Sequence, residues 1–136
     1  MGINGPYPVE SAALFRRGLY AVSEVAAVIV FRSEPPVQER DKGSGLPLWA
    51  LDLMDADPEA RREWRTFRVK IAAAVQPVLP DPIPGTSLRP VVLEGMTVNP
   101  WLPKDKETNQ PIAKMEYALR ATGVTAPKRV EAGKAA

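Results

Sequence analysis

The chain has 136 residues, of which 45% are hydrophobic and 25% are charged, and its formal net charge is +2. This is the composition of one soluble globular domain, and no apolar run is long enough for a membrane span. The sequence has no cysteine and no histidine, which excludes disulfides and removes the commonest general base and zinc ligand. We therefore expect a protein that is not an enzyme and that binds no metal and no cofactor.

The first residues predict an arm rather than a core element. The start, MGINGPYPVE, lacks the basic and apolar regions of a signal peptide, which favours a cytoplasmic protein. Residues 11–17 predict one helical turn that Ser11 caps, and this turn is too short to be stable alone.

Three strands are predicted in the first half of the chain. Residues 19–32 (LYAVSEVAAVIVFR) are rich in β-branched side chains and predict a long first strand that ends before Pro35. The alanines in this stretch leave a helix open as the alternative. Residues 48–54 and 64–75 alternate between apolar and polar side chains, the pattern of a strand with one buried face.

The fourth and fifth predicted strands, residues 89–99 and 112–122, follow a connection that is rich in proline. Residues 77–85 (PVLPDPIPG) hold four prolines in nine residues, which excludes a regular element. Gly95 in the fourth strand predicts a bulge or a bend. Residues 104–111 form a polar loop between the two strands.

A mainly β fold follows, with five strands closed into a small barrel. A flat sheet would leave an open edge and an uncovered face, whereas a barrel removes both. The five-stranded barrel that fits is the OB-fold, here with the proline-rich connection between strands 3 and 4. We expect an N-terminal arm at 1–17, the OB-like barrel at 18–126 and a flexible basic tail at 127–136. The predicted core is Val25, Ile29, Trp49, Leu51, Leu53, Phe67, Val69, Ile71, Leu93, Tyr117 and Leu119.

Three segments carry a resemblance to a known family: LPLWALDLMDADPEARREWRTFRVKIAAAVQPVLP, LRPVVLEGMTVNPWL and YALRATGV. Together they resemble the actinobacterial family of plasmid replication, integration and excision activators, over residues 19–126. The most specific parts are DADPEAR and VKIA. The resemblance implies a DNA transaction or regulatory role on a mobile element, and it brings no catalytic residues. The strand order is also similar to that of single-stranded-DNA-binding OB proteins, although this chain ends in KRVEAGKAA rather than in their acidic tip.

Positive charge is densest at residues 61–70, where five cations accompany a single acid, Glu63. On a strand, Trp64 would share the solvent face with Arg68 and Lys70. A ring beside cations suits single-stranded DNA, because bases stack on rings and phosphates pair with cations. The alternative is a solvated hairpin with Trp64 packed at the barrel rim. The predicted nucleic-acid-binding residues are Arg61, Arg62, Trp64, Arg65, Arg68, Lys70, Trp101, Lys104, Lys106, Lys114 and Arg120.

Two further groups have competing interpretations. Trp101 is expected in the loop before the fifth strand, where it either contacts a ligand or caps a barrel end. Four acids, Asp52, Asp55, Asp57 and Glu59, lack the spacing of a calcium loop. They are expected to keep the tip of the hairpin soluble and to repel phosphate.

The sequence thus predicts a non-enzymatic protein that binds nucleic acid, with single-stranded DNA favoured, in replication, integration or excision of a mobile element. The alternative is a protein-interaction module or accessory regulator that recruits a partner without contacting DNA. The near-neutral charge favours the alternative, and the cations at 61–70 favour DNA binding. A replication or recombination protein is an expected partner, and strand edges left unpaired favour a homo-oligomer. No membrane partner is expected.

Overall fold

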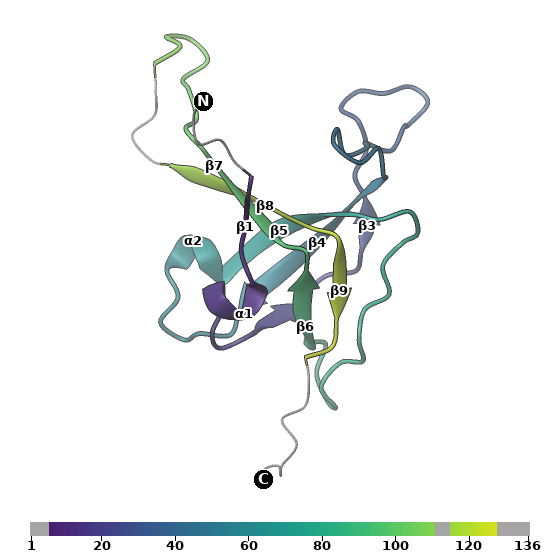
Figure 1. The fold of residues 1–136 in the computed structure, drawn as a ribbon, viewed down its shortest axis with the longest axis vertical. Coiled ribbons are helices and arrows are strands. Elements are labelled where there is room, and N and C mark those ends of the chain that lie inside the picture. The colour runs from purple at the N-terminus through teal and green to yellow at the C-terminus, as the bar shows by residue number, and fades with distance from the viewer. Residues whose placement is uncertain (1–5, 111–114, 128–136) are drawn as a thin grey trace.

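The computed structural model describes residues 6–110 and 115–127, without the side chains of Glu63 and Trp64. Within these residues the chain is mainly β, as predicted, with nine strands and two four-residue helices (Figure 1). The helices are α1 (Ser11–Leu14) and α2 (Arg62–Arg65). The strands are β1 (Tyr7–Pro8), β2 (Leu19–Ala21), β3 (Ala26–Ala27), β4 (Leu48–Asp55), β5 (Thr66–Ala72), β6 (Arg89–Glu94), β7 (Thr97–Trp101), β8 (Glu116–Ala121) and β9 (Gly123–Thr125).

The strands form one curled open sheet, a half-barrel, in the order β1-β7-β8-β5-β4-β2-β6-β9, and β3 pairs with β4. All named pairs are antiparallel except β5 with β8, which is parallel. A closed barrel of five strands is therefore not confirmed. Neither helix in the described part of the chain is long and apolar enough to cross a membrane.

The predicted long first strand is broken, because residues 22–25 bulge out of the pairing with β4. Ala21 pairs with Leu53 and Ala26 with Ala50, so four residues lie opposite two. The Ser23 hydroxyl accepts the Asp52 N–H at 3.0 Å, where a backbone carbonyl would accept it in a regular ladder. Such a bulge bends the strand and increases its twist.

The predicted bend at Gly95 is confirmed and divides the fourth strand into β6 and β7. Gly95 has a φ of +60°, and a Cβ there would collide with the side chain of Thr122. Thr122 in turn divides the fifth strand into β8 and β9, and its N–H donates to the Glu94 carbonyl at 2.8 Å. The first residues of the predicted fifth strand and the tail beyond residue 127 lie outside the described residues.

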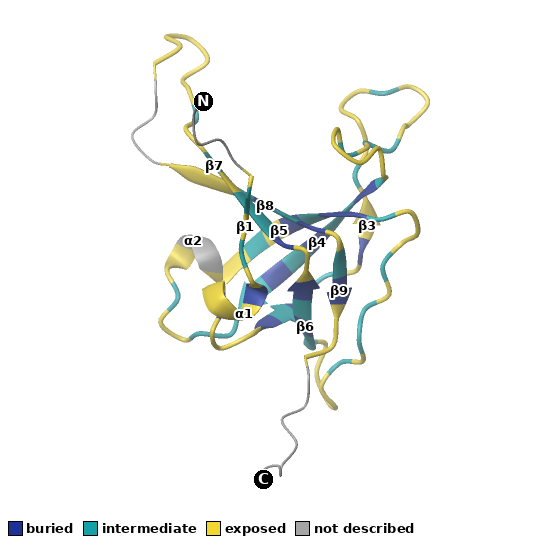
Figure 2. Ribbon diagram, in the orientation of Figure 1, coloured by how far each residue is buried: buried dark blue, intermediate teal, exposed yellow. Residues whose placement is uncertain are grey.

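The buried core residues come mainly from β2, β4, β5, β6, β8 and β9 (Figure 2). Seven predicted core residues are buried: Val25, Leu51, Leu53, Val69, Ile71, Leu93 and Leu119. Trp49 and Phe67 are partly buried and pack against these residues. Ile29 and Tyr117 are 48% and 47% exposed, so their assignment to the core is wrong. Ile29 has left the sheet, and Tyr117 lies near the outer end of β8.

The N-terminal segment contributes to this core, which the sequence did not predict. Phe15 follows α1 and is 5% exposed. Its ring stacks on that of Phe67 with a centroid distance of 5.2 Å. Ser11 is the first residue of α1 rather than its cap. The proline-rich connection has no strand or helix, as predicted, and Leu79 packs from it against the core.

Candidate nucleic-acid interface

The outer face of β5 carries the cations that the alternation predicted. Val69 and Ile71 are buried, so Arg68 and Lys70 project to the opposite side of the sheet. Lys70 is in register with Arg120 on the parallel strand β8. The sheet therefore brings together cations that are fifty residues apart in sequence.

Each of these cations has an acidic partner, which the sequence did not predict. Arg68 Nε lies 3.0 Å from Asp52 Oδ1, and Arg120 Nη1 lies 2.7 Å from Asp41 Oδ1. Lys70 Nζ lies 3.9 Å from an oxygen of Glu39. Partly exposed pairs of this kind contribute about 0–1 kcal/mol. The loop at residues 28–47 thus supplies two of the three acids, because it folds back towards β5 and β8.

Asp41 is held in its charged form. The Ser44 N–H and hydroxyl donate to its Oδ2 at 2.9 and 3.0 Å. These hydrogen bonds, first the backbone one, lower the pKa of Asp41. Burial opposes them to a lesser extent, and the charge of Arg120 lowers the pKa by a still smaller amount. The carboxylate therefore stays charged to a lower pH than an ordinary aspartate does.

The arginines before β5 are free of acids. Arg61, Arg62 and Arg65 are exposed and form no ion pair with any residue in the described part of the chain. Arg65 Nε makes a long hydrogen bond of 3.4 Å to the Ala60 carbonyl. The prediction that Trp64 lies on the strand is wrong, because it belongs to α2; its side chain is not described.

The acids of the hairpin tip shape its turns. Asp55 Oδ1 accepts the Asp57 N–H at 3.0 Å, and Asp57 Oδ1 accepts the Glu59 N–H at 2.9 Å. These side chains act locally on their own backbone, as aspartates in turns commonly do. No three acids converge on a metal-sized site within the ranges that the structure describes.

Trp101 is the last residue of β7 rather than a loop residue, which corrects its predicted position. Its side chain is 49% exposed. Because Val98 packs against the core, alternation directs Thr97, Asn99 and Trp101 to the outer face. Thr97 is in register with Arg120, which puts Trp101 about 13 Å further along the strand.

Three more predicted residues lie in or next to the loop between β7 and β8. Lys104 and Lys106 are exposed in that loop, and no acid of the described chain pairs with either. Lys114 lies outside the described residues. The described part of this loop and the loop at 28–47 both extend towards the top of the view in Figure 1, the first at the left and the second at the right.

Two hollows open on the outer face. One, of about 540 Å³, is lined by Ser23, Glu24, Ala26, Ala27, Val28, Ile29, Ala50, Asp52, Arg68 and Lys70. The other, of about 440 Å³, is lined by Arg120 with Thr97, Asn99 and Ala118, among others, and by Asp41 of the loop. The three ion-paired cations therefore line these two hollows.

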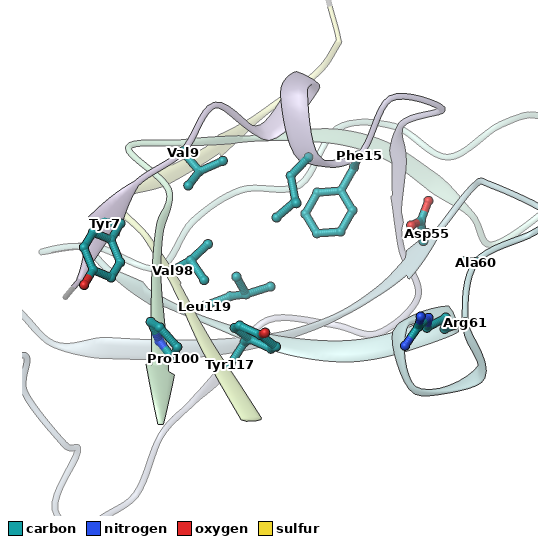
Figure 3. Close-up of a pocket in the computed structure, with 11 residues that line it drawn as sticks. Tyr7, Val9, Phe15, Asp55, Ala60, Arg61, Val98, Pro100, Tyr117 and Leu119 are labelled. Carbon is teal, nitrogen blue, oxygen red and sulfur yellow. The ribbon is translucent and has the colours of Figure 1, made fainter. Parts of the chain in front are cut away.

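A third cavity, of about 540 Å³, lies at the end of β4 where Asp55 is, and the sequence did not predict it. Figure 3 shows its mainly apolar walls, with Asp55 and Arg61 at one side. The lining residues are Tyr7, Val9, Leu14, Phe15, Asp55, Ala60, Arg61, Val98, Pro100, Tyr117 and Leu119. They come from four distant parts of the sequence, so no local pattern indicates the cavity.

Comparisons of the chain with protein families, with curated proteins and with solved structures found no match. The resemblance to the plasmid replication, integration and excision activators therefore stays an expectation.

Proposed function

We propose that the protein is not an enzyme and that it binds single-stranded DNA on the outer face of an OB-like barrel. The barrel part of this proposal groups eight of the nine strands into five segments: β2 with β3, β4, β5, β6 with β7, and β8 with β9. The remaining strand, β1, belongs to the N-terminal arm and pairs with β7. The strand pairing supports this count, because β6 pairs with β2 and β9, whereas β7 pairs with β8. β6 and β7 are the two halves of one bent segment, and they lie near opposite ends of the sheet order.

A stripe of cations carries the proposal of DNA binding: Arg62, Arg65, Arg68 and Lys70, from α2 along the outer face of β5. Arg62 and Arg65 have no acidic partner among the described residues, so they can take phosphates without breaking an existing pair. Each cation that contacts a phosphate releases counterions. Trp101 on the same outer face offers a half-exposed ring on which a base can stack.

The acids beside this stripe adjust DNA binding rather than prevent it. The side chain of Arg68 is 65% exposed within its pair with Asp52, and that of Lys70 is 37% exposed within its pair with Glu39. Since exposed pairs contribute little stability, a phosphate can replace either carboxylate. DNA binding should therefore depend first on Arg62 and Arg65, and to a lesser extent on the paired cations.

The resemblance described above supplies the biological setting of the proposal. We infer a cytoplasmic protein that acts in replication, integration or excision of a mobile element, with a replication or recombination protein as a further partner. A partner-recruiting module that never contacts DNA is the second candidate. The exposed apolar residues of the loop at 28–47 favour this second function, and Phe31 is 82% exposed there.

Fluorescence anisotropy with labelled oligothymidine and with a duplex, over a series of salt concentrations, tests the proposal. The single strand should bind more tightly, and its log–log slope against salt should be about −0.7 per phosphate contact. Arg62→Ala with Arg65→Ala should flatten that slope by about 1.4. Arg16→Ala with Arg17→Ala is the matched control, because it removes two exposed arginines elsewhere.

Three results would contradict this proposal. If the wild-type protein shows no salt-dependent binding even at about 50 mM salt, DNA binding fails and partner recruitment takes its place. If the duplex binds more tightly, the preference for single strands is wrong. If the control pair flattens the slope as much as the α2 pair, the cation stripe is not the site.

A further inference from the structure

The loop after β3 forms a hairpin, residues 28–39, that presents an apolar tip. Val30 N–H donates to the Val37 carbonyl at 2.8 Å and joins the two arms. The Ser33 hydroxyl donates to the Val30 carbonyl and accepts the Val37 N–H, both at 2.9 Å. Phe31 at the tip is 82% exposed and Val37 is 53% exposed. Because hydrogen bonds hold the tip in one conformation, its exposed ring is preorganised for insertion into a partner.

The cavity at the far end of β4 suits such a tip. It has about 540 Å³ of space, and its walls are mainly apolar. The rings of Tyr7, Phe15 and Tyr117 contribute to these walls (Figure 3). Leu14 also lines the cavity and is 47% exposed. An aromatic side chain that enters this space would be buried on several sides, as the anchor residues of interfaces are.

The charges beside the tip and the cavity are complementary. Arg32 and Glu34 follow Phe31 at the tip, and the Arg32 guanidinium lies 5.0 Å from the centroid of the Phe31 ring. The cavity has one acid, Asp55, and one cation, Arg61. Asp55 uses Oδ1 for a hydrogen bond within its own turn, and Arg61 pairs with no acid in the described chain. Opposite charges in matching positions orient two surfaces and favour their encounter.

We propose that the hairpin tip of one copy of this chain inserts into the cavity of a second copy. Phe31 enters between the rings, Arg32 faces Asp55, and Glu34 faces Arg61. The tip cannot fill its own cavity. The base of the hairpin is hydrogen-bonded to Leu48, the first residue of β4, whereas the cavity lies at Asp55, the last residue of β4. About 23 Å of strand therefore separates the base of the hairpin from the cavity.

The contact joins two different surfaces, so a single contact leaves a pair open. The copy that inserts its tip retains a free cavity, the copy that receives it retains a free tip, and further copies can add in the same direction. The protein should therefore form a head-to-tail series rather than a symmetric dimer. This assembly is independent of DNA and concerns residues outside the cation stripe.

Sedimentation velocity of the full chain without DNA, over a wide range of concentration, tests the assembly. The mass of the wild-type protein should rise with concentration beyond that of a dimer. Phe31→Ser and Leu14→Glu should each weaken association by about tenfold or more, since each removes one side of the buried contact. Val78→Ser is the matched control, because Val78 is 86% exposed in another loop, and it should associate like wild type.

An equimolar mixture of the two variants identifies the contact. The Phe31→Ser chain retains its cavity and the Leu14→Glu chain retains its tip, so the mixture should form a one-to-one dimer and stop there. Glu34→Arg and Arg61→Glu should each weaken association, and the two changes in one chain should restore it. A monomeric wild-type protein, or variants that are each monomeric and do not associate when mixed, would overturn the proposal. An equal effect of Val78→Ser would do the same.

Discussion

Arg120 on β8 donates a hydrogen bond of 2.7 Å to Asp41 and thereby ties the loop after β3 to a central strand of the sheet. Asp41 is fixed in turn by the backbone and hydroxyl of Ser44. In addition to its backbone hydrogen bonds with Leu48, the loop that carries the apolar tip is thus anchored by charged hydrogen bonds. Such bonds are stronger than neutral ones and sensitive to protonation.

The anchoring of this loop should depend on pH. The pKa of Asp41 in the folded protein is lowered from its ordinary value of 3.8, first by Ser44 and then by Arg120. A carboxyl with a lowered pKa stabilises the fold above pH 3.8, and this contribution is lost as the pH falls through the lowered value. Asp41→Asn should reduce the free energy of unfolding at neutral pH, and the difference from wild type should shrink in acid. Urea unfolding at several pH values measures this, and a difference that is independent of pH would contradict it.

The stacked pair of Phe15 and Phe67 should contribute unequally to stability. Phe15 is 5% exposed, whereas Phe67 is only partly buried. Phe15→Ala should therefore destabilise the protein by about 3–5 kcal/mol, and Phe67→Ala by less. The double variant should lose less than the sum, with a coupling of about 0.5–1.5 kcal/mol from the ring contact. Chemical unfolding of the four proteins gives this cycle, and additive losses would show that the stacking contributes nothing.

Gly95 should tolerate alanine poorly, for two separable reasons. Its φ of +60° is unfavourable for a side chain, and the new Cβ would collide with Thr122. Gly85→Ala is the matched control, because Gly85 has a φ of +79° with nothing within 4 Å of a Cβ. The control should lose about 1–2 kcal/mol and Gly95→Ala should lose more. Adding Thr122→Ala to Gly95→Ala should recover the excess; thermal unfolding midpoints with no excess at Gly95 would contradict the collision.

Removal of an acid from the outer face should strengthen the proposed DNA binding. Asp52→Asn frees Arg68, so affinity for oligothymidine should rise and the salt slope should steepen by about 0.7. Asp81→Asn is the control, since it makes the same change of charge in the exposed proline-rich connection. Equal gains from both variants would mean that net charge acts at long range, and that Arg68 does not contact phosphate.

Local patterns in the sequence predicted the parts of the fold that local chemistry decides. Alternation at residues 48–54 and 65–71 gave the buried face of β4 and β5, because a strand has a period of two and one face must be apolar. Gly95 predicted a bend, since a residue without Cβ adopts a positive φ without steric cost. The proline-rich connection was likewise predicted to be irregular, because proline lacks a backbone donor.

The remaining features depend on contacts between distant segments. Nothing around Phe15 distinguishes it from an exposed arm residue until Phe67 is brought beside it. The alternation placed the start of the third predicted strand at Trp64, whereas Trp64 belongs to the helical turn α2 and the strand begins at Thr66. In the sequence, Glu39 and Asp41 have no feature that distinguishes them from other loop acids. They pair with Lys70 and Arg120 because their loop folds back towards β5 and β8.

The parallel pairing of β5 with β8 has a consequence for how the chain is made. β8 lies between β5 and β7 in the sheet, although it is near the end of the sequence. During synthesis β4 and β5 leave the ribosome early, and one edge of β5 then has no partner until β8 follows. An uncovered edge is a template for other chains, and pairings between distant segments form slowly. The nascent chain is therefore most open to mispairing in this interval, when a chaperone that covers the edge of β5 would help it most.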